Sequence, residues 1–519
     1  MKRAGSRRIE KHSDDRNSII RVTVAAVLLG IQVAWLIYVI VHLQDRWPWI
    51  ATAGSYVTVF VLVGVYCRRM NSASKIAWMI VIAAVPVLGV TLYLLMGRKN
   101  VNKRMRQHFS EIDSLLEGLV GQEAEVWRRL TEEDPRIANE FRYILNETGM
   151  PVFSNTDVRY FPDQADAFEK QLEELEKAEK FIFLEYYAIE DRESFARVKR
   201  ILRRKAAEGV EVRLFYDEIG SISFLTQRFI RQMEAIGIDC RVFNPVAPVM
   251  NLFMNNRDHR KIMVVDNRVA FTGGYNLANE YFHLTEPYGY WKDSGIMLKG
   301  DAVSGMTLLF LEMWNAMELT DTDFMRYLRR PPYTSSGRGF VQPYAGTPMR
   351  DERVAEEVYM NVLRGAQSYV YFVSPYLVIT DEMSRELTSA AKRGIDVRIV
   401  IPGIPDKKTV YLETRSFLPQ LVRAGVRIFI YTPGFSHAKM CVSDDFLSIV
   451  GTINLDYRSL YLHFENAVLV KDGETAEKVR IDFEDMFGKS REYTEEDTKR
   501  NHAPYRFVQA FLRLIAPLL

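Results

Sequence analysis

The chain has 519 residues, enough for about three domains of typical size. Its 68 Lys and Arg nearly balance 66 Asp and Glu, the formal net charge is +2, and 48% of the residues are hydrophobic. This composition excludes an intrinsically disordered chain, and the charge balance speaks against a general nucleic-acid binder, which carries a large basic excess. Cys67, Cys240 and Cys441 lie far apart without a CxxC pair, so they indicate neither a disulfide framework nor a zinc site.

The N-terminal region combines basic and apolar segments. Residues 1–21 form a tail with seven Lys and Arg against three acidic residues. Three uncharged stretches follow, namely Val22–Val41, Trp47–Cys67 and Ile76–Gly97. At ~1.5 Å per residue each could cross the ~30 Å hydrocarbon core as a helix, whereas a cleaved signal peptide would have one shorter run. We therefore expect an integral membrane anchor of two to three apolar helices over residues 22–97.

The orientation of this anchor stays open from sequence. The basic tail favours a cytoplasmic N-terminus. Three full crossings would then place the basic cluster within residues 98–106 outside, although basic residues prefer the inside. Pro86 and Gly89 interrupt the third stretch, so a kinked or re-entrant helix would resolve the conflict.

The rest of the chain carries a duplicated α/β pattern. After a helical connector over residues 98–150, for which we expect a solvated face, short β-rich runs alternate with helices that end at glycine. The runs at residues 181–187, 209–216 and 237–243 recur at 369–376, 394–401 and 425–431. The pattern predicts homologous domains over 151–328 and 351–490, a Pro-, Gly- and Ser-rich linker over 329–350, and a C-terminal tail over 491–519.

Each half contains the same constellation of polar residues. The first half has His259, Lys261 and Asp266, followed by Gly273, Gly274 and Asn276; the second has His437, Lys439 and Asp444, followed by Gly451, Thr452 and Asn454. The spacing from the histidine is identical in both. Because residues i and i+2 of a strand point to the same face, each His and Lys should project together. Two halves packed face to face would then place two His, two Lys and two Asn around one cleft.

This set of side chains suits a phosphodiester. Lysines neutralise phosphate oxygens, the amides of Asn276 and Asn454 donate hydrogen bonds to them, and one imidazole can attack phosphorus while the other protonates the leaving alkoxide. A histidine pair requires no metal or other cofactor for this chemistry. Asp293 and Glu465 lie downstream of the two motifs, and we expect them to fix the imidazole tautomers. Asp266 and Asp444, although part of the candidate catalytic motifs, directly follow a strand, so we interpret them as organising the turn or the lysines.

The paired pattern HxK(x)4D with G-[GT]-x-N resembles the phospholipase D superfamily. Longer segments resemble bacterial cardiolipin synthases of that superfamily, namely residues 212–220, 256–261, 289–293, 435–439 and 454–459. The stretch from Trp78 to Gly97 is similar to the membrane-anchoring region of that family. One departure is His463, since similar synthases commonly have Asn before the Phe-Glu pair.

The resemblance implies an α/β fold with two phospholipase D-like domains packed around one active site, in a multi-pass protein of the bacterial cell membrane. It further implies a metal-free phosphatidyl transfer in two steps. One histidine attacks a phosphatidylglycerol and releases glycerol, and a second phosphatidylglycerol then takes the phosphatidyl group to give cardiolipin. By family analogy His259 is the nucleophile and His437 the general acid and later base. The expected partners are phosphatidylglycerol and anionic membrane lipid, without nucleic acid.

Several alternatives share these residues. A membrane phospholipase D, or phosphatidyl transfer to another alcohol such as serine or ethanolamine, would use the same motifs. A nucleic-acid phosphodiesterase is disfavoured by the apolar stretches, and a catalytically silent lipid-binding scaffold would not need both histidines. The apolar stretch Tyr505–Leu519 could lie in the membrane interface or dock onto the second domain.

Overall fold

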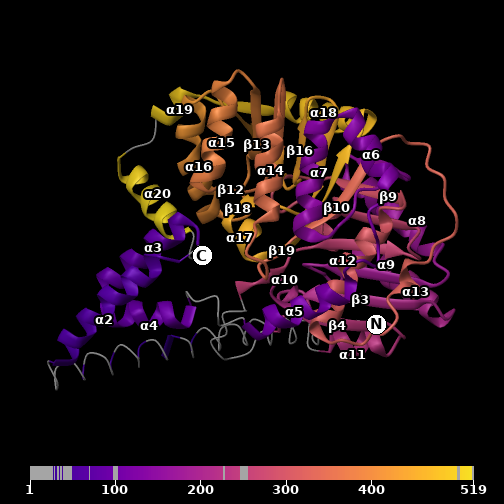
Figure 1. Cartoon of the computed structure of the whole chain (residues 1–519), viewed down its shortest axis with the longest axis horizontal. Coiled ribbons are helices and arrows are strands. Elements are labelled where there is room, and N and C mark those ends of the chain that lie inside the picture. The colour runs from indigo at the N-terminus through magenta and orange to yellow at the C-terminus, as the bar shows by residue number, and fades with distance from the viewer. Residues whose placement is uncertain are drawn as a thin grey trace, which may run out of the picture.

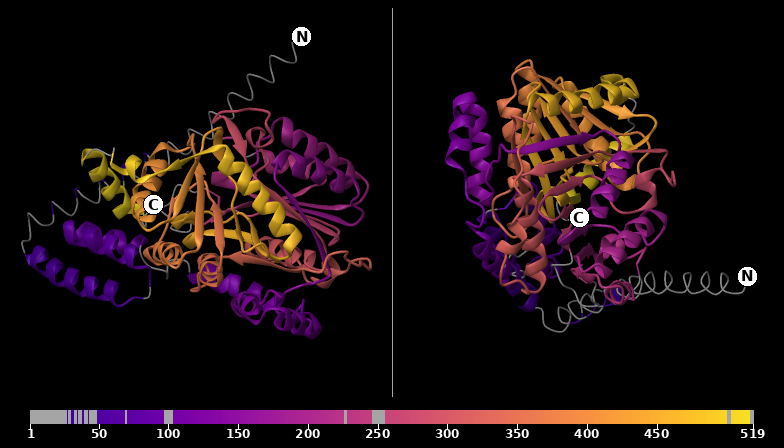
Figure 2. Two further views of the ribbon diagram at one scale, coloured as in Figure 1. Left: turned by 90° about the horizontal axis from the view of Figure 1, so that it is seen from above. Right: turned by 90° about the vertical axis from the view of Figure 1, so that its right-hand side faces the viewer.

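Two mixed β-sheets, one from each half of the chain, form the centre of the protein (Figures 1 and 2). The computed structural model describes residues 49–68, 70–96, 103–225, 228–245, 255–499 and 503–516, together with single positions between 27 and 42.

The first sheet has seven strands in the order β1-β9-β7-β6-β2-β3-β4. Their bounds are β1 (Thr156–Phe161), β2 (Phe181–Tyr186), β3 (Glu211–Asp217), β4 (Asp239–Phe243), β6 (Lys261–Val265), β7 (Val269–Gly273) and β9 (Gly295–Gly300). Strands β2, β3 and β4 are parallel, and the remaining neighbours are antiparallel. Alternate residues of β2 lie in two different hydrophobic clusters, because both faces of the sheet are covered. Phe183 belongs to the first cluster and Leu184 belongs to the second.

The second sheet repeats this order as β10-β19-β17-β16-β11-β13-β14, with β20 added at the end. Its strands are β10 (Phe340–Gly346), β11 (Tyr369–Val373), β13 (Asp396–Pro402), β14 (Arg427–Tyr431), β16 (Met440–Ser443), β17 (Leu447–Gly451), β19 (His463–Lys471) and β20 (Ser490–Tyr493). A short parallel pair joins β12 (Leu377–Val378) to β18 (Leu455–Asp456). The shared strand order confirms the predicted duplication of an α/β domain.

The helices follow the same repeat. Those of the first half are α8 (Gln164–Glu176), α9 (Glu193–Ala207), α10 (Glu218–Ser221), α11 (Phe229–Glu234), η3 (Asn279–Phe282), α12 (Val303–Met317) and α13 (Met325–Leu328). Those of the second half are α14 (Val354–Gly365), α15 (Asp381–Lys392), α16 (Lys408–Arg423), α17 (Tyr457–Tyr461), α18 (Gly473–Gly488), α19 (Glu495–Lys499) and α20 (Ala503–Ile515). Gly209 and Gly394 lie just beyond the ends of α9 and α15 with φ of 91° and 94°, a conformation that favours glycine.

Each half completes the core of the other. Helix α12 packs on β6, β7 and β9 of its own sheet and also on β10 of the second sheet. Helix α18 packs on β16, β17 and β19 and reaches β1 of the first sheet, where Tyr160 donates a hydrogen bond to Asp482 at 2.5 Å. Residues of both halves consequently share one continuous hydrophobic cluster.

The connector and the linker each differ from the prediction in one respect. The connector forms α5 (Lys103–Leu116), α6 (Ala124–Glu133) and α7 (Pro135–Thr148), as expected for a helical segment. Its apolar face is not solvated, however, because Phe141 and Ile144 are fully buried in the shared core. Residues 340–346, expected in the linker, form β10 and pair along their whole length with β19. Pro343 is tolerated there because β10 is an edge strand.

The N-terminal region forms α2 (Trp49–Tyr66), α3 (Ser72–Ala84) and α4 (Pro86–Met96). The third apolar stretch is broken at Val85, as Pro86 predicts, and α4 packs back on α3 so closely that a Cβ at Gly89 would lie 2.5 Å from the carbonyl oxygen of Val81. Within the described part of the chain, no helix combines the length and apolarity that a membrane span requires. The stretch Val22–Val41 lies outside the described residues apart from single positions.

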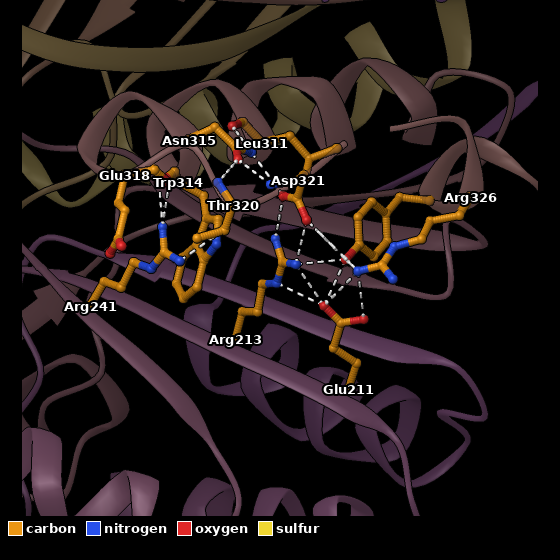
Figure 3. A network of polar contacts seen from close by, with 11 residues as sticks. Glu211, Arg213, Arg241, Leu311, Trp314, Asn315, Glu318, Thr320, Asp321 and Arg326 are labelled. Atoms are coloured by element: carbon orange, nitrogen blue, oxygen red, sulfur yellow. Dashed lines mark hydrogen bonds and ion pairs between the residues drawn. The ribbon is translucent and has the colours of Figure 1, made fainter. Parts of the chain in front are cut away.

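A buried ion-pair network fixes the first sheet to the segment after α12 (Figure 3). Arg213 on β3 donates two hydrogen bonds of 2.7 Å to Asp321, and it is also 2.6 Å from the hydroxyl oxygen of Tyr327. Arg241 on β4 lies 4.0 Å from the ring centre of Trp314 and donates to the carbonyl oxygen of Glu318.

We expect Asp321→Ala to lower the free energy of unfolding by about 3–5 kcal/mol, because it leaves the buried Arg213 without its main partner. Thermal unfolding of the purified protein measures the effect. Glu318→Ala is the matched control, since the side chain of Glu318 is exposed and only its backbone carbonyl is used. Equal melting temperatures for the two variants would contradict the assignment.

Candidate active site

Two short strand pairs cross between the halves and carry both histidines. Strand β5 (Arg257–Asp258) pairs in parallel with the start of β19 in the second half. Strand β15 (Gly434–Ser436) pairs in parallel with β8 (Tyr290–Lys292) of the first half. The residue after β5 is His259 and the residue after β15 is His437. Each histidine is therefore positioned by a strand of the opposite half.

His259 of the first half meets the carboxylate of the second half. Its backbone N–H donates to the carbonyl oxygen of Phe464 at 2.9 Å, which continues the pairing of β5 with β19. The side chains that follow then face each other, and Nδ1 of His259 lies 3.0 Å from the Glu465 carboxylate. This contact leaves Nε2 of His259 as the ring nitrogen that does not face the carboxylate.

His437 makes the reciprocal contact with the first half. Its backbone N–H donates to the carbonyl oxygen of Lys292 at 2.7 Å, and its Nδ1 lies 2.6 Å from Oδ2 of Asp293. Sequence placed Asp293 and Glu465 downstream of the two motifs, but it did not indicate which histidine each would meet. In the structure each carboxylate contacts the histidine of the other half.

Each carboxylate is held in place by the Gly-[Gly/Thr] element of its own half. A Cβ at Gly274 would lie 2.0 Å from Oδ1 of Asp293, so only glycine fits beside this carboxylate. At the corresponding position of the second half, the hydroxyl of Thr452 donates to Oε2 of Glu465. Ser459 donates to the other oxygen of Glu465. The glycine of the first motif thus leaves room for Asp293, whereas the threonine of the second donates a hydrogen bond to Glu465.

Both lysines of the motifs are buried beside the histidines. Nζ of Lys261 donates to the carbonyl oxygen of His259 at 2.7 Å. Nζ of Lys439 donates to the carbonyl oxygen of His437 and lies 2.8 Å from Nδ1 of that residue. Burial lowers the pKa of Lys261 to about 8 and the pKa of Lys439 to about 7. A phosphate between the two halves would add negative charge beside these amino groups and favour their cationic form.

The two imidazoles differ in their preference for a proton. Burial lowers the pKa of His259 well below its ordinary value, and the positive charges of neighbouring lysines and histidines lower it further. Burial and Lys439 also lower the pKa of His437, to about 4, but the adjacent Asp293 opposes them. The surroundings therefore favour a neutral His259. They stabilise a protonated His437 more than a protonated His259.

Asp266 and Asp444 do not lie beside the histidines. Each follows the motif strand at its far end, with φ of 55° and 53° respectively. Asp266 accepts three hydrogen bonds of 2.8 Å from the backbone N–H groups of residues 179–181. Asp444 accepts three equivalent bonds from residues 367–369. Their place in the candidate catalytic set is corrected accordingly, because these carboxylates bind the backbone at the start of the neighbouring strands β2 and β11 and not the histidines.

The two motif asparagines have different surroundings. Asn276 donates to the hydroxyl oxygen of Tyr281 at 2.7 Å and accepts from the backbone of Ala188, so much of its amide is engaged. Oδ1 of Asn454 is buried without a hydrogen-bond partner among the described residues. Direct phosphate binding by both amides stays a prediction. The ring of Tyr281 lies 5.5 Å from that of His437. Sequence reasoning missed this residue although it follows Asn276 by five positions, because the second half has Ser459 at the matching position and the repeat therefore gives no signal.

The ring of Tyr187 is similarly placed, 4.9 Å from that of His259. Cys441 lies on β16 in the core, and burial raises the pKa of its thiol well above the ordinary value, as expected of an unreactive cysteine.

A third imidazole adjoins this site. The ring of His463 lies 5.5 Å from that of His259, and its Nδ1 is 3.5 Å from Oε1 of Glu465. His259, His463 and Glu465 each offer an atom that could bind a metal ion, and these atoms lie within 4.8 Å of one another. The sequence did not suggest a metal site here.

The duplicated fold, with one His–Lys motif from each half meeting at crossed carboxylates, defines a two-domain enzyme of the phospholipase D type. The family description "Cardiolipin synthase, PLD-like domain" matches residues 172–300 and 359–487, and "Phospholipase_D-nuclease N-terminal" matches residues 57–98.

Individual proteins agree with this match. A cardiolipin synthase of Geobacillus kaustophilus is 32% identical over 89% of this chain and 92% of its own length. An uncharacterized protein of Streptococcus mutans is 39% identical over 87% of this chain and 98% of its own. A phosphatidylserine synthase from Haemophilus influenzae has the same fold, with a TM-score of 0.58 at 14% identity over 74% of this chain and all of its own. The chain belongs to the cardiolipin synthase family and is an enzyme of this type.

We expect Gly274→Ala to reduce turnover by about 10–100-fold, because the added methyl group must displace Asp293 from His437. The measurement is the steady-state rate of cardiolipin formation from phosphatidylglycerol in mixed micelles. Gly488→Ala serves as the control, since a Cβ there would meet nothing within 4 Å. Unchanged turnover in Gly274→Ala would show that Asp293 does not depend on this close approach.

Proposed function

We propose that the protein is a membrane-bound phosphatidyltransferase that condenses two phosphatidylglycerol molecules into cardiolipin and glycerol through a phosphatidyl-histidine intermediate. The observation that carries this proposal is the pair of crossed contacts, His259 with Glu465 and His437 with Asp293. The membership of the family supports phosphatidylglycerol as the substrate.

In the first step Nε2 of the neutral His259 attacks the phosphorus of phosphatidylglycerol. A P–N bond forms, the P–O bond to glycerol breaks, and a proton passes from His437 to the departing glycerol oxygen. Glu465 accepts the hydrogen bond of Nδ1 and stabilises the positive charge that develops on His259. Lys261 and Lys439 stabilise the phosphate oxygens, whose negative charge increases in the transition state.

In the second step the terminal hydroxyl of another phosphatidylglycerol replaces glycerol. The neutral His437 takes the proton of this hydroxyl, its oxygen forms the new P–O bond, and the P–N bond to His259 breaks. Cardiolipin leaves, His259 is neutral again and His437 is protonated again, so the enzyme has returned to its starting state. Asp293 stabilises the imidazolium form of His437, which donates its proton in the first step and is formed again in the second.

The assignment of roles follows from the unequal surroundings of the two histidines. At His259, neighbouring cationic groups add to the effect of burial on the pKa, which favours a free lone pair. At His437, the carboxylate of Asp293 raises the pKa against burial, which favours a proton donor. Family analogy points to the same roles.

Membrane attachment is proposed at one end of the molecule. Helices α2, α3, α4 and α20 lie there together (Figures 1 and 2), and α20 contacts both α3 and α16. Gln509 and Arg513 attach α20 to the second domain through the backbone of Leu412 and the ring of Phe417. Large apolar side chains of α20 remain exposed, namely Phe507, Val508 and Phe511. The tail thus docks on the protein and also presents an apolar face beside the anchor.

The proposed anchor comprises residues 22–97. Helices α3 and α4 have 13 and 11 residues and fold back on each other, so we propose that this third segment enters the membrane without crossing it. If the first two apolar stretches, Val22–Val41 and Trp47–Cys67, each cross the membrane once, a re-entrant third segment leaves the basic tail and both catalytic domains on the same side.

We expect the purified protein with phosphatidylglycerol alone to produce cardiolipin and free glycerol in equal amounts, measured by lipid mass analysis. His259→Ala and His437→Ala should each lose at least about 1,000-fold in rate, because both act on the reacting atoms. Cys441→Ala is the control and should remain active. Phosphatidic acid as the main product would instead indicate a phospholipase D, and near-normal synthesis by either histidine variant would contradict the paired mechanism.

We expect kcat/KM, which already declines as His437 loses its proton above its pKa of about 4, to fall more steeply as the pH rises through about 7 to 8. Below their pKa values Lys439 and Lys261 are cationic and attract the phosphate; above them they lose the proton and the attraction. A pH series with phosphatidylglycerol in neutral micelles measures the effect without changing the surface charge of the carrier. A profile that stays flat across this range would argue against buried, titrating lysines at the phosphate.

We expect the double variant Phe507→Ser/Phe511→Ser to lower activity on phosphatidylglycerol vesicles several-fold more than activity in detergent micelles, because α20 loses its apolar contact with the bilayer. The matched control is Ile481→Ser on α18, which also replaces an exposed apolar side chain by serine but lies in the second domain. Equal ratios of vesicle to micelle activity in both variants would exclude α20 as an interfacial helix.

A further inference from the structure

His463 is an imidazole for which the proposed reaction has no use. Its side chain is 10% exposed, and neither ring nitrogen has a hydrogen-bond partner among the described residues. A buried polar group without a partner is costly, so the position is expected to have one in some state of the protein. Its Nδ1 points to Glu465, the carboxylate that also faces Nδ1 of His259.

Two of the three spacings among these side chains match those of a tetrahedral metal site. Zinc binds histidine nitrogen and carboxylate oxygen at about 2.0–2.2 Å, so neighbouring ligand atoms of a tetrahedral site are about 3.3 Å apart. The Glu465 carboxylate lies 3.0 Å from Nδ1 of His259 and 3.5 Å from Nδ1 of His463. One ligand atom of each residue lies within 4.8 Å of the other two, so an approach of the two rings by up to about 1.5 Å would complete the three-ligand arrangement.

The ligand set selects the kind of cation. Two imidazoles with one carboxylate suit Zn²⁺, Co²⁺ or Ni²⁺, whereas Mg²⁺ and Ca²⁺ prefer oxygen ligands. Lys261 and Arg257 lie close enough for their charges to act on His463, and they would oppose a weakly bound cation. Only a metal that forms strong bonds to imidazole would overcome this repulsion.

We propose that His259, Glu465 and His463 form an inhibitory binding site for a divalent transition metal. A neutral imidazole has one N–H and one lone pair. When the metal takes the lone pair at Nδ1 of His259, the ring proton must reside on Nε2, and Nε2 then has no lone pair with which to attack phosphorus. The metal also occupies the carboxylate that would stabilise the histidine during the reaction. The inhibition rests on the proposed phosphatidyl transfer, whereas the binding does not.

Binding is tested with Co²⁺ added to the purified full-length chain without a histidine tag. We expect one Co²⁺ per chain with the strong visible absorption of tetrahedral coordination, and displacement of this Co²⁺ by Zn²⁺. His463→Asn and His463→Ala should both lose the absorption. His108→Asn, the same substitution at a partly exposed histidine on α5, should retain it. An absent spectrum in the wild type, or one that persists in both His463 variants, would overturn the proposal.

Inhibition is tested as the ratio of cardiolipin formation with Zn²⁺ to that with EDTA. We expect this ratio to be about 0.1 or lower in the wild type and in His108→Asn. It should stay near one in the His463 variants that remain active. A wild-type ratio near one despite bound Co²⁺ would overturn inhibition. Tetrahedral Co²⁺ binding without any cardiolipin formation in EDTA would support the metal site while refuting the proposed function.

Discussion

The pairing of two short strands across the halves is the constraint on which the candidate site depends. β5 lies against β19 and β15 lies against β8, and each pair ends with a histidine beside the carboxylate of the other half. Because the backbone N–H groups of His259 and His437 continue these ladders, the two side-chain contacts are set by main-chain register. Each histidine depends on the opposite half for its carboxylate and for the pairing of its strand, so the complete site forms only when both halves are folded and packed together.

This arrangement explains why the core is shared. Helix α12 reaches the edge strand of the second sheet, and α18 reaches the edge strand of the first. A small shift between the halves would separate His259 from Glu465 and His437 from Asp293 at the same time. The extensive common cluster, with α5 and α7 packed into it, provides the rigidity that two histidine–carboxylate contacts of 3.0 Å and 2.6 Å require.

Much of the fold could be predicted from sequence because each half is a continuous stretch of the chain, and its strands and helices can be recognised from local residue patterns. Strand-helix patterns with the same order in both halves predict the two sheets, and the identical spacing from His259 and His437 predicts a paired site. The crossed contacts could not be predicted, since they join residues 206 and 144 positions apart and depend on how the halves pack. Strand β10 was not predicted because Pro343 and the neighbouring glycines are typical of a linker, although they also fit an edge strand. Asp266 belongs to the motif by spacing, yet three backbone hydrogen bonds give it a structural role.

The most direct test uses a phosphatidyl ester of p-nitrophenol, whose leaving group departs without a general acid. We expect a burst of p-nitrophenolate in His437→Ala and Asp293→Asn, because both spare the nucleophile, and no burst in His259→Ala and Glu465→Gln. The variants should therefore group across the halves, each histidine with the carboxylate of the other domain. A burst in Glu465→Gln that is absent from Asp293→Asn would contradict the crossed pairing.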